Sequence, residues 1–126
     1  MQNKSMKSTV VSPVVSASKI IGEAVVNHQK ENLGKVHEMV IDTELGTVAY
    51  LVLSFGGFLG MGNKLFAIPW QGFEFSPTEH KLILTVNKEK LKNAPGFDPE
   101  KLPNFADRSW GDSVHNYYGY RAAWNN

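Results

Sequence analysis

Hydrophobic residues in this chain fall into short alternating runs separated by turn residues, a pattern typical of β-strands. The runs predict six strands, which we place at residues 22–26, 35–42, 47–55, 65–70, 73–75 and 81–86. The third run is apolar on both faces, which indicates a strand that lies in the centre of a sheet or closes a barrel. Gly46 allows a tight turn before it, because glycine adopts a positive φ without steric cost.

The alternation fails in the second predicted strand. Val36 and Val40 fall on one face, whereas Met39 and Ile41 fall on the other. Either both faces are covered, or a β-bulge resets the phase. We expect a bulge near His37, because a small closed sheet must bend sharply.

Helix signals replace the strand pattern after residue 86. Three short helices are predicted, at residues 88–92, from Asp98-Pro99, and from Asp107 or Ser109. Asn and Asp are good N-caps, and proline is favoured at the first helical position. Gly119 is the expected end of the third helix.

Composition and charge exclude several classes of function. The chain has 126 residues, which is the size of one domain, and 13 Lys and Arg against 12 Asp and Glu give a net charge of +1. No global field therefore attracts nucleic acid or an anionic membrane. The absence of cysteine excludes disulfides, thiolate metal sites and a cysteine nucleophile. The longest apolar run, residues 48–53, is too short to span a membrane, so we expect a cytoplasmic protein without membrane insertion.

Motifs that carry chemistry are incomplete. His37-Glu38 begins like a zinc-protease motif, but Ile41 stands where the second ligand is needed. The glycine-rich loop at residues 56–62 resembles a dinucleotide fingerprint, but a strand rather than a helix follows it. We therefore predict no catalytic, metal or cofactor-binding residues and no cofactor. The weak point is His115 with Asp112, three residues apart on one helix face, where a carboxylate could orient an imidazole.

Exposed aromatic and apolar residues are the better candidates for function. Phe58 and Leu59, at the tip of the glycine loop, either fold back over the barrel or contact a partner. The C-terminal part is too short to have its own core, so its aromatic residues must pack on the barrel or on another chain. The candidate interaction residues are Phe58, Leu59, Trp70, Trp110, Tyr117, Tyr118 and Trp124. A homodimer would bury the C-terminal set, and a monomer whose tail wraps its own barrel would do the same.

Several motifs in order resemble the PRC-barrel family. They are residues 19–25, Asn32 to Val36, Val40 to Gly46, Tyr50 to Gly60, and Lys64 to the Ile68-Pro69-Trp70 triplet. The family is named for the H subunit of the photosynthetic reaction centre and includes the C-terminal domain of the ribosome maturation factor RimM. The sequence lacks the transmembrane helix of the first and the preceding barrel of the second, so neither partner is carried over.

The resemblance implies a mainly-β fold, a small and strongly bent six-stranded barrel followed by short C-terminal helices. The resemblance covers residues 18–87, and we therefore divide the chain into a flexible arm (1–17), the barrel domain (18–87) and a helical extension (88–126). It implies a non-catalytic protein-interaction or adaptor module, and we expect self-association as a homodimer with no nucleic acid bound. The alternatives are a small-ligand binder or enzyme that uses the glycine loop or barrel mouth, and, more weakly, an RNA- or ribosome-associated protein.

Overall fold

One six-stranded sheet forms the centre of the molecule in the computed structural model, which describes residues 14–56, 63–76 and 81–125. The strands are β2 (Ala24–Val26), β3 (Asn32–Asp42), β4 (Thr47–Gly56), β5 (Asn63–Pro69), β6 (Phe73–Ser76) and β7 (Lys81–Leu84). The helices are α1 (Ala17–Ile20), α2 (Lys88–Lys92) and α3 (Arg108–Tyr118), with 3₁₀ turns η2 (Trp70–Gly72) and η3 (Ala123–Asn125).

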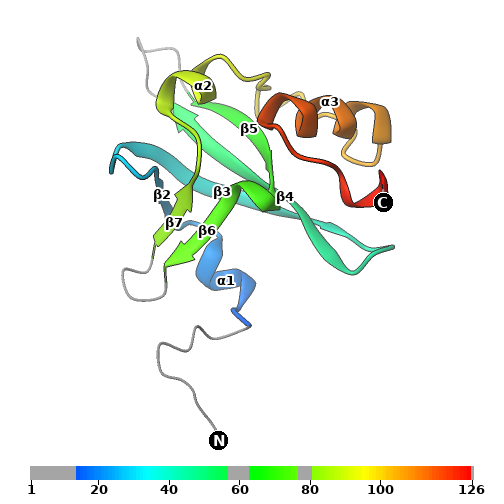
Figure 1. Cartoon of the computed structure of the whole chain (residues 1–126), viewed down its shortest axis with the longest axis horizontal. Helices are drawn as coiled ribbons and strands as arrows, with labels where there is room; N and C mark the ends of the chain where they lie inside the picture. Colours follow the sequence, from blue (N-terminus) through cyan, green and yellow to red (C-terminus); the bar gives the residue numbers. More distant parts are fainter. Residues whose placement is uncertain (1–13, 57–62, 77–80, 126) are drawn as a thin grey trace, which may run out of the picture.

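The strands lie in the order β5-β4-β3-β2-β7-β6 and curl into a half-barrel (Figure 1). Strands β3, β4 and β5 form an antiparallel meander, and β6 pairs with β7 in the same way. Parallel pairing joins β2 to β7, with Val25 opposite Leu82. The predicted mainly-β fold with six bent strands and short helices is therefore confirmed.

The core lies inside the curl of the sheet and beneath the C-terminal helix. Tyr50, Leu51, Val52 and Leu53 of β4 are all at most 1% exposed, which confirms that both faces of this strand are covered. One face meets the interior of the half-barrel, and α3 packs against the β4–β5 side (Figure 1). Continuous burial of this kind explains why β4 lacks the polar positions of a half-exposed strand.

Strand β3 is longer and less regular than the sequence indicates. It begins at Asn32 instead of Lys35, and its register with β4 shifts between Val36 and Glu38, which confirms the bulge near His37. Gly34 in this strand has φ +112°, and a Cβ atom there would lie 2.1 Å from the Ser54 carbonyl oxygen. A glycine is therefore required where β3 passes close to the β4 backbone.

Two of the three predicted C-terminal helices are present. Asn87 caps α2 by accepting from Lys90 N at 2.7 Å, and Asp107 caps α3 through Ser109 N at 3.0 Å. Gly119 ends α3 with φ +84°, as predicted. The prediction of a helix from Asp98-Pro99 is wrong, because these residues form a turn after a bridge that pairs Phe97 with Leu65. Pro103 adds a reason, since a residue before proline disfavours helical geometry.

Several boundaries also differ from the predictions. Trp70 begins η2 instead of ending the fourth strand, and β7 ends at Leu84. The sequence predicts no helix near residue 17, yet α1 forms there and buries Ile20 to 1% exposure. Ile20 therefore belongs to the core.

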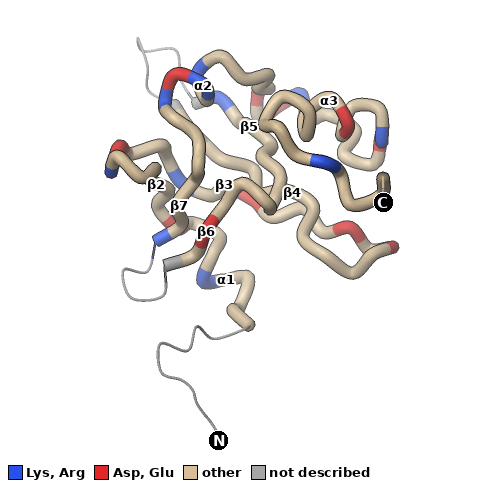
Figure 2. Tube along the Cα trace, viewed as in Figure 1, with Lys and Arg blue, Asp and Glu red and all other residues tan. Residues whose placement is uncertain are grey.

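Charged residues are interspersed along the fold in the view of Figure 2. Helix α2, for example, alternates Lys88, Glu89 and Lys90. In the part of the chain that the structure describes, no helix is both long and apolar enough to cross a membrane.

Candidate functional site

Helix α3 buries an aromatic cluster against β4. The Tyr50 ring is the centre of this cluster, with centroid distances of 5.4 Å to Trp110, 5.5 Å to His115 and 6.3 Å to Phe105. These separations and tilted or edge-on angles are those of favourable aromatic packing. Trp110 therefore packs within its own chain.

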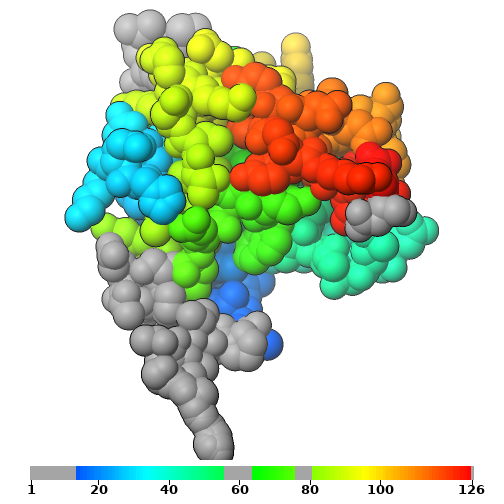
Figure 3. Space-filling view, viewed as in Figure 1, coloured from blue at the N-terminus to red at the C-terminus, as the bar shows by residue number. Residues whose placement is uncertain are grey.

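The segment after Gly119 folds back over α3. Ala122 is 1% exposed, and Trp124 lies across the helix so that its Nε1 donates to Asp112 Oδ1 at 2.9 Å. Asn125 Nδ2 donates to the same oxygen at 2.8 Å. In Figure 3 the red end of the chain lies between the orange of α3 and the teal of the β3–β4 turn.

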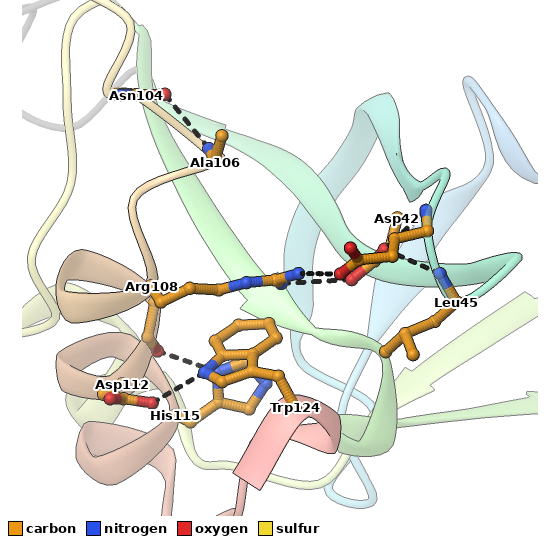
Figure 4. Close-up of polar contacts among 10 residues, drawn as sticks. Asp42, Leu45, Asn104, Ala106, Arg108, Asp112, His115 and Trp124 are labelled. Carbon is orange, nitrogen blue, oxygen red and sulfur yellow. Dashed lines mark hydrogen bonds and ion pairs between the residues drawn. The ribbon is translucent and has the colours of Figure 1, made fainter.

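Arg108 joins α3 to the β3–β4 turn. Its guanidinium stacks 4.3 Å from the Trp124 ring centroid and donates to Asp42 Oδ2 at 3.1 Å and to Glu44 Oε1 at 3.3 Å (Figure 4). A planar guanidinium can stack on an indole and bind carboxylates at the same time. One side chain therefore connects the helix, the tail and the turn.

Asp42 organises the β3–β4 turn. Its Oδ1 accepts from the Glu44 and Leu45 amides at 3.0 and 2.9 Å, which is the pattern that aspartate uses to stabilise turns. The Leu45 hydrogen bond first, and then the Arg108 hydrogen bond, hold the pKa of Asp42 below its usual range. The carboxylate is therefore ionised at neutral pH, and both of its oxygens accept hydrogen bonds.

Two buried tyrosine hydroxyls lie at the contact between α3 and the sheet. In the described part of the chain, the hydroxyls of Tyr50 and Tyr118 have no hydrogen-bond partner. Burial raises the pKa of Tyr50 to about 12 and raises that of Tyr118 further. Ionisation of either phenol would place a charge in an apolar contact.

Two open pockets lie beside Trp124, and we call them the flanking pockets. One, of about 370 Å³, lies between Ile41, Phe105 and Arg108, and the other, of about 220 Å³, lies between Leu45, Trp70 and Trp124. Both pockets are bordered by Asp42, Ala49 and Trp124. A third pocket of about 580 Å³ lies beside Asn116 and Arg121.

Exposed apolar side chains gather at the rims of the two flanking pockets. Ile41, Leu45 and Trp70 are 49%, 44% and 36% exposed, and we call these three residues the hairpin patch. Leu45 and Trp70 border the smaller pocket, and Ile41 borders the larger one. Clustering of this kind is more informative than a single exposed apolar residue.

The predicted interaction residues have different positions. Trp70 is at the surface, whereas Tyr118 is 7% exposed in the core. The Tyr117 hydroxyl donates to the Lys90 carbonyl at 2.6 Å, and Trp110 and Trp124 pack on the same chain. Phe58 and Leu59 lie outside the described residues. The structure thus brings Trp70 and Trp124 together beside the β3–β4 turn, where both border one pocket, whereas Trp110 packs on Tyr50 and Phe105.

His115 and Asp112 are neighbours but do not form the pair that the sequence allows. His115 Nδ1 lies 2.8 Å from the Gly111 carbonyl oxygen, which it contacts within the helix. Asp112 instead accepts from Trp124 and Asn125. Within the described ranges, no three His, Asp or Glu side chains are placed to hold a metal ion.

Sequence reasoning missed Arg108 and Tyr50 as site residues. Arg108 contacts carboxylates more than sixty positions earlier in the chain, and no local pattern reveals such a contact. Tyr50 carried one usable signal, a polar hydroxyl within the most apolar predicted strand.

Comparison with known families assigns the fold. The family model described as the PRC-barrel domain matches residues 13–91, which is more than half of the chain. The chain belongs to the PRC-barrel family. No curated protein matches this sequence.

The PRC-barrel match and the site overlap only in part. The match includes all six strands, the hairpin patch and α2 up to Leu91, and it ends before α3. Arg108, Asp112 and Trp124 therefore lie beyond the matched residues. The PRC-barrel supplies the turn, and the C-terminal extension supplies the helix and the tryptophan that cover it.

Proposed function

We propose that this chain is a non-catalytic protein-interaction module, with the hairpin patch at the centre of its binding surface. The supporting observation is the grouping of Ile41, Leu45 and Trp70 around two open pockets. Apolar and aromatic residues in contact with concave surfaces are common at the centres of protein interfaces.

The polar groups around the pockets favour a protein partner over a small ligand. Arg108 already donates to Asp42 and Glu44, and Gln71 already donates to the Arg121 carbonyl oxygen. A small-molecule site needs polar groups that are free to fix the orientation of its ligand. Here the exposed apolar rim is the feature that a partner can use.

A second copy of the chain is the first partner to test. The C-terminal aromatics cover their own sheet, so a homodimer would use the hairpin patch instead of the tail surface that the sequence indicates. We expect the full chain to associate at tens of micromolar in sedimentation velocity. The Ile41→Ser, Leu45→Ser double variant should remain monomeric with an unchanged circular dichroism spectrum.

Leu102→Ser is the matched control, because Leu102 is 56% exposed and lies outside both flanking pockets. It should associate like the wild type. A monomeric wild type would rule out self-association, and the interaction role would then depend on crosslinked partners from native cells. If those partners bind the double variant as well as they bind the wild type and Leu102→Ser, the proposed function is wrong.

A further inference from the structure

The α3 surface under Trp124 has the features of an indole-binding site. Arg108, Gly111, Asp112 and His115 lie at helical spacings of three and four residues and so share one face, which we call the tryptophan seat. Each member matches a different part of the ring. Arg108 stacks on the indole face, Asp112 accepts from the indole N–H, and the His115 ring packs edge-on at 5.2 Å.

Gly111 gives the seat its depth. A Cβ atom at this position would lie 2.7 Å from Trp124 Cζ2 and 2.6 Å from the Tyr50 hydroxyl oxygen. Any larger residue would therefore push the indole away from the helix. The shape, the hydrogen-bond acceptor and the cation together select a tryptophan side chain.

Side-chain contacts provide most of the attachment of Trp124. Among the described residues, the hydrogen bonds that join the segment beyond Tyr120 to the rest of the molecule are the two to Asp112 and the one from Gln71 Nε2 to the Arg121 carbonyl at 3.2 Å. The Arg121 bonds to Asn125 lie within the segment itself. Segments held in this way open at a lower free energy than strands held in a sheet.

The contact of Trp124 with the seat of its own chain leaves space that a partner could fill. Trp124 borders both flanking pockets, of about 370 and 220 Å³, and the hairpin patch lies at their rims. A tethered side chain has an effective concentration advantage over one from another molecule. A partner segment therefore needs additional contacts, and apolar residues on either side of its tryptophan would make them in the two pockets.

We propose that the tryptophan seat binds a tryptophan side chain presented by a partner protein, and that Trp124 occupies it as an autoinhibitory contact. This inference rests on the proposed interaction role, because it assigns chemistry to the partner of the same surface. The partner segment carries a tryptophan flanked by apolar residues.

The full chain with Trp124→Ala opens the seat for a direct test. The probe is a synthetic peptide with the sequence of residues 120–126, and binding is measured by isothermal titration calorimetry. We expect the peptide to bind the variant at least tenfold more tightly than it binds the wild type, because Trp124 no longer competes. The same peptide with leucine in place of tryptophan should bind at least tenfold more weakly, and adding Asp112→Ala to the variant should have a similar effect.

Trp110→Ala is the matched control. It also removes a tryptophan from this region but leaves Trp124 in the seat, so the peptide should bind it no better than it binds the wild type. Equal gains in both variants, or no binding to Trp124→Ala while its circular dichroism spectrum is native, would overturn the proposal. Neither result would affect the dependence of association on the hairpin patch, so the two proposals can fail separately.

Discussion

At the scale of single residues, Gly34 shows how one missing Cβ atom sets the distance between two strands. A side chain there would meet the Ser54 carbonyl oxygen at 2.1 Å, and the backbone already has φ +112°. Gly22 provides a comparison, because its φ is +90° and nothing lies within 4 Å of a Cβ built there. The two positions separate the cost of the backbone conformation from the cost of the collision.

We predict that Gly34→Ala lowers the free energy of unfolding by at least about 3 kcal/mol more than Gly22→Ala does. Gly22→Ala should cost about 1–2 kcal/mol, which is the usual penalty for a left-handed non-glycine residue. Urea unfolding of both variants measures the difference. Equal losses would mean that β3 and β4 separate at Gly34 without cost.

At the scale of elements, the contact between α3 and the sheet depends on neutral phenols. The pKa values of Tyr50 and Tyr118 both exceed the value of about 10 for an unfolded tyrosine, because burial disfavours the anion. Their stabilising contribution is therefore complete below pH 10 and is lost as the pH rises towards about 12, the pKa of Tyr50.

We predict that the urea midpoint of the wild type decreases as the pH is raised from 10 to 12. The midpoint of Tyr118→Phe should decrease less steeply over the same range. At pH 7 the variant should be as stable as the wild type or slightly more stable, since the lost hydroxyl has no hydrogen-bond partner among the described residues. Tyr117→Phe is the control, because it retains Tyr118 and should therefore still lose stability at alkaline pH. Identical slopes for the two variants would show that burial does not suppress the ionisation of Tyr118.

Element positions were largely predictable because strand alternation and helix caps are local signals. The bulge at His37 and the caps Asn87 and Asp107 follow from a few neighbouring residues. The Asp98-Pro99 signal was misleading, because the pairing of Phe97 with Leu65 is a long-range contact that overrides local preference. For the same reason the contact of Arg108 with Asp42, which completes the candidate site, could not be predicted from the sequence.

At the scale of the whole molecule, the C-terminal extension is part of the core and not an appendage. Val114 and Tyr118 of α3 are 3% and 7% exposed, and Phe97 exchanges two backbone hydrogen bonds with Leu65 at the edge of β5. Removal of this extension would expose the apolar face of β4 and an unpaired strand edge.

We predict that a chain ending at Pro95 loses cooperative thermal unfolding and binds a dye specific for exposed apolar surface. A chain ending at Gly119 is the control, because it retains α3 and should unfold cooperatively at a lower midpoint temperature. Differential scanning calorimetry compares the two. A cooperative transition in the shorter chain would mean that the half-barrel is stable without the extension.

The parallel pairing of β2 with β7 has a consequence for the order in which the sheet can assemble. The β3–β4 and β4–β5 hairpins pair strands that follow one another in the chain, so few residues separate their paired ends. Val25 and Leu82, by contrast, are separated by the part of the chain that contains β3, β4, β5 and β6. The entropy lost on closing a loop grows with its length, so this pairing is the costliest in the sheet. We therefore expect the meander to form early and to serve as a template, and the seam between β2 and β7 to close last.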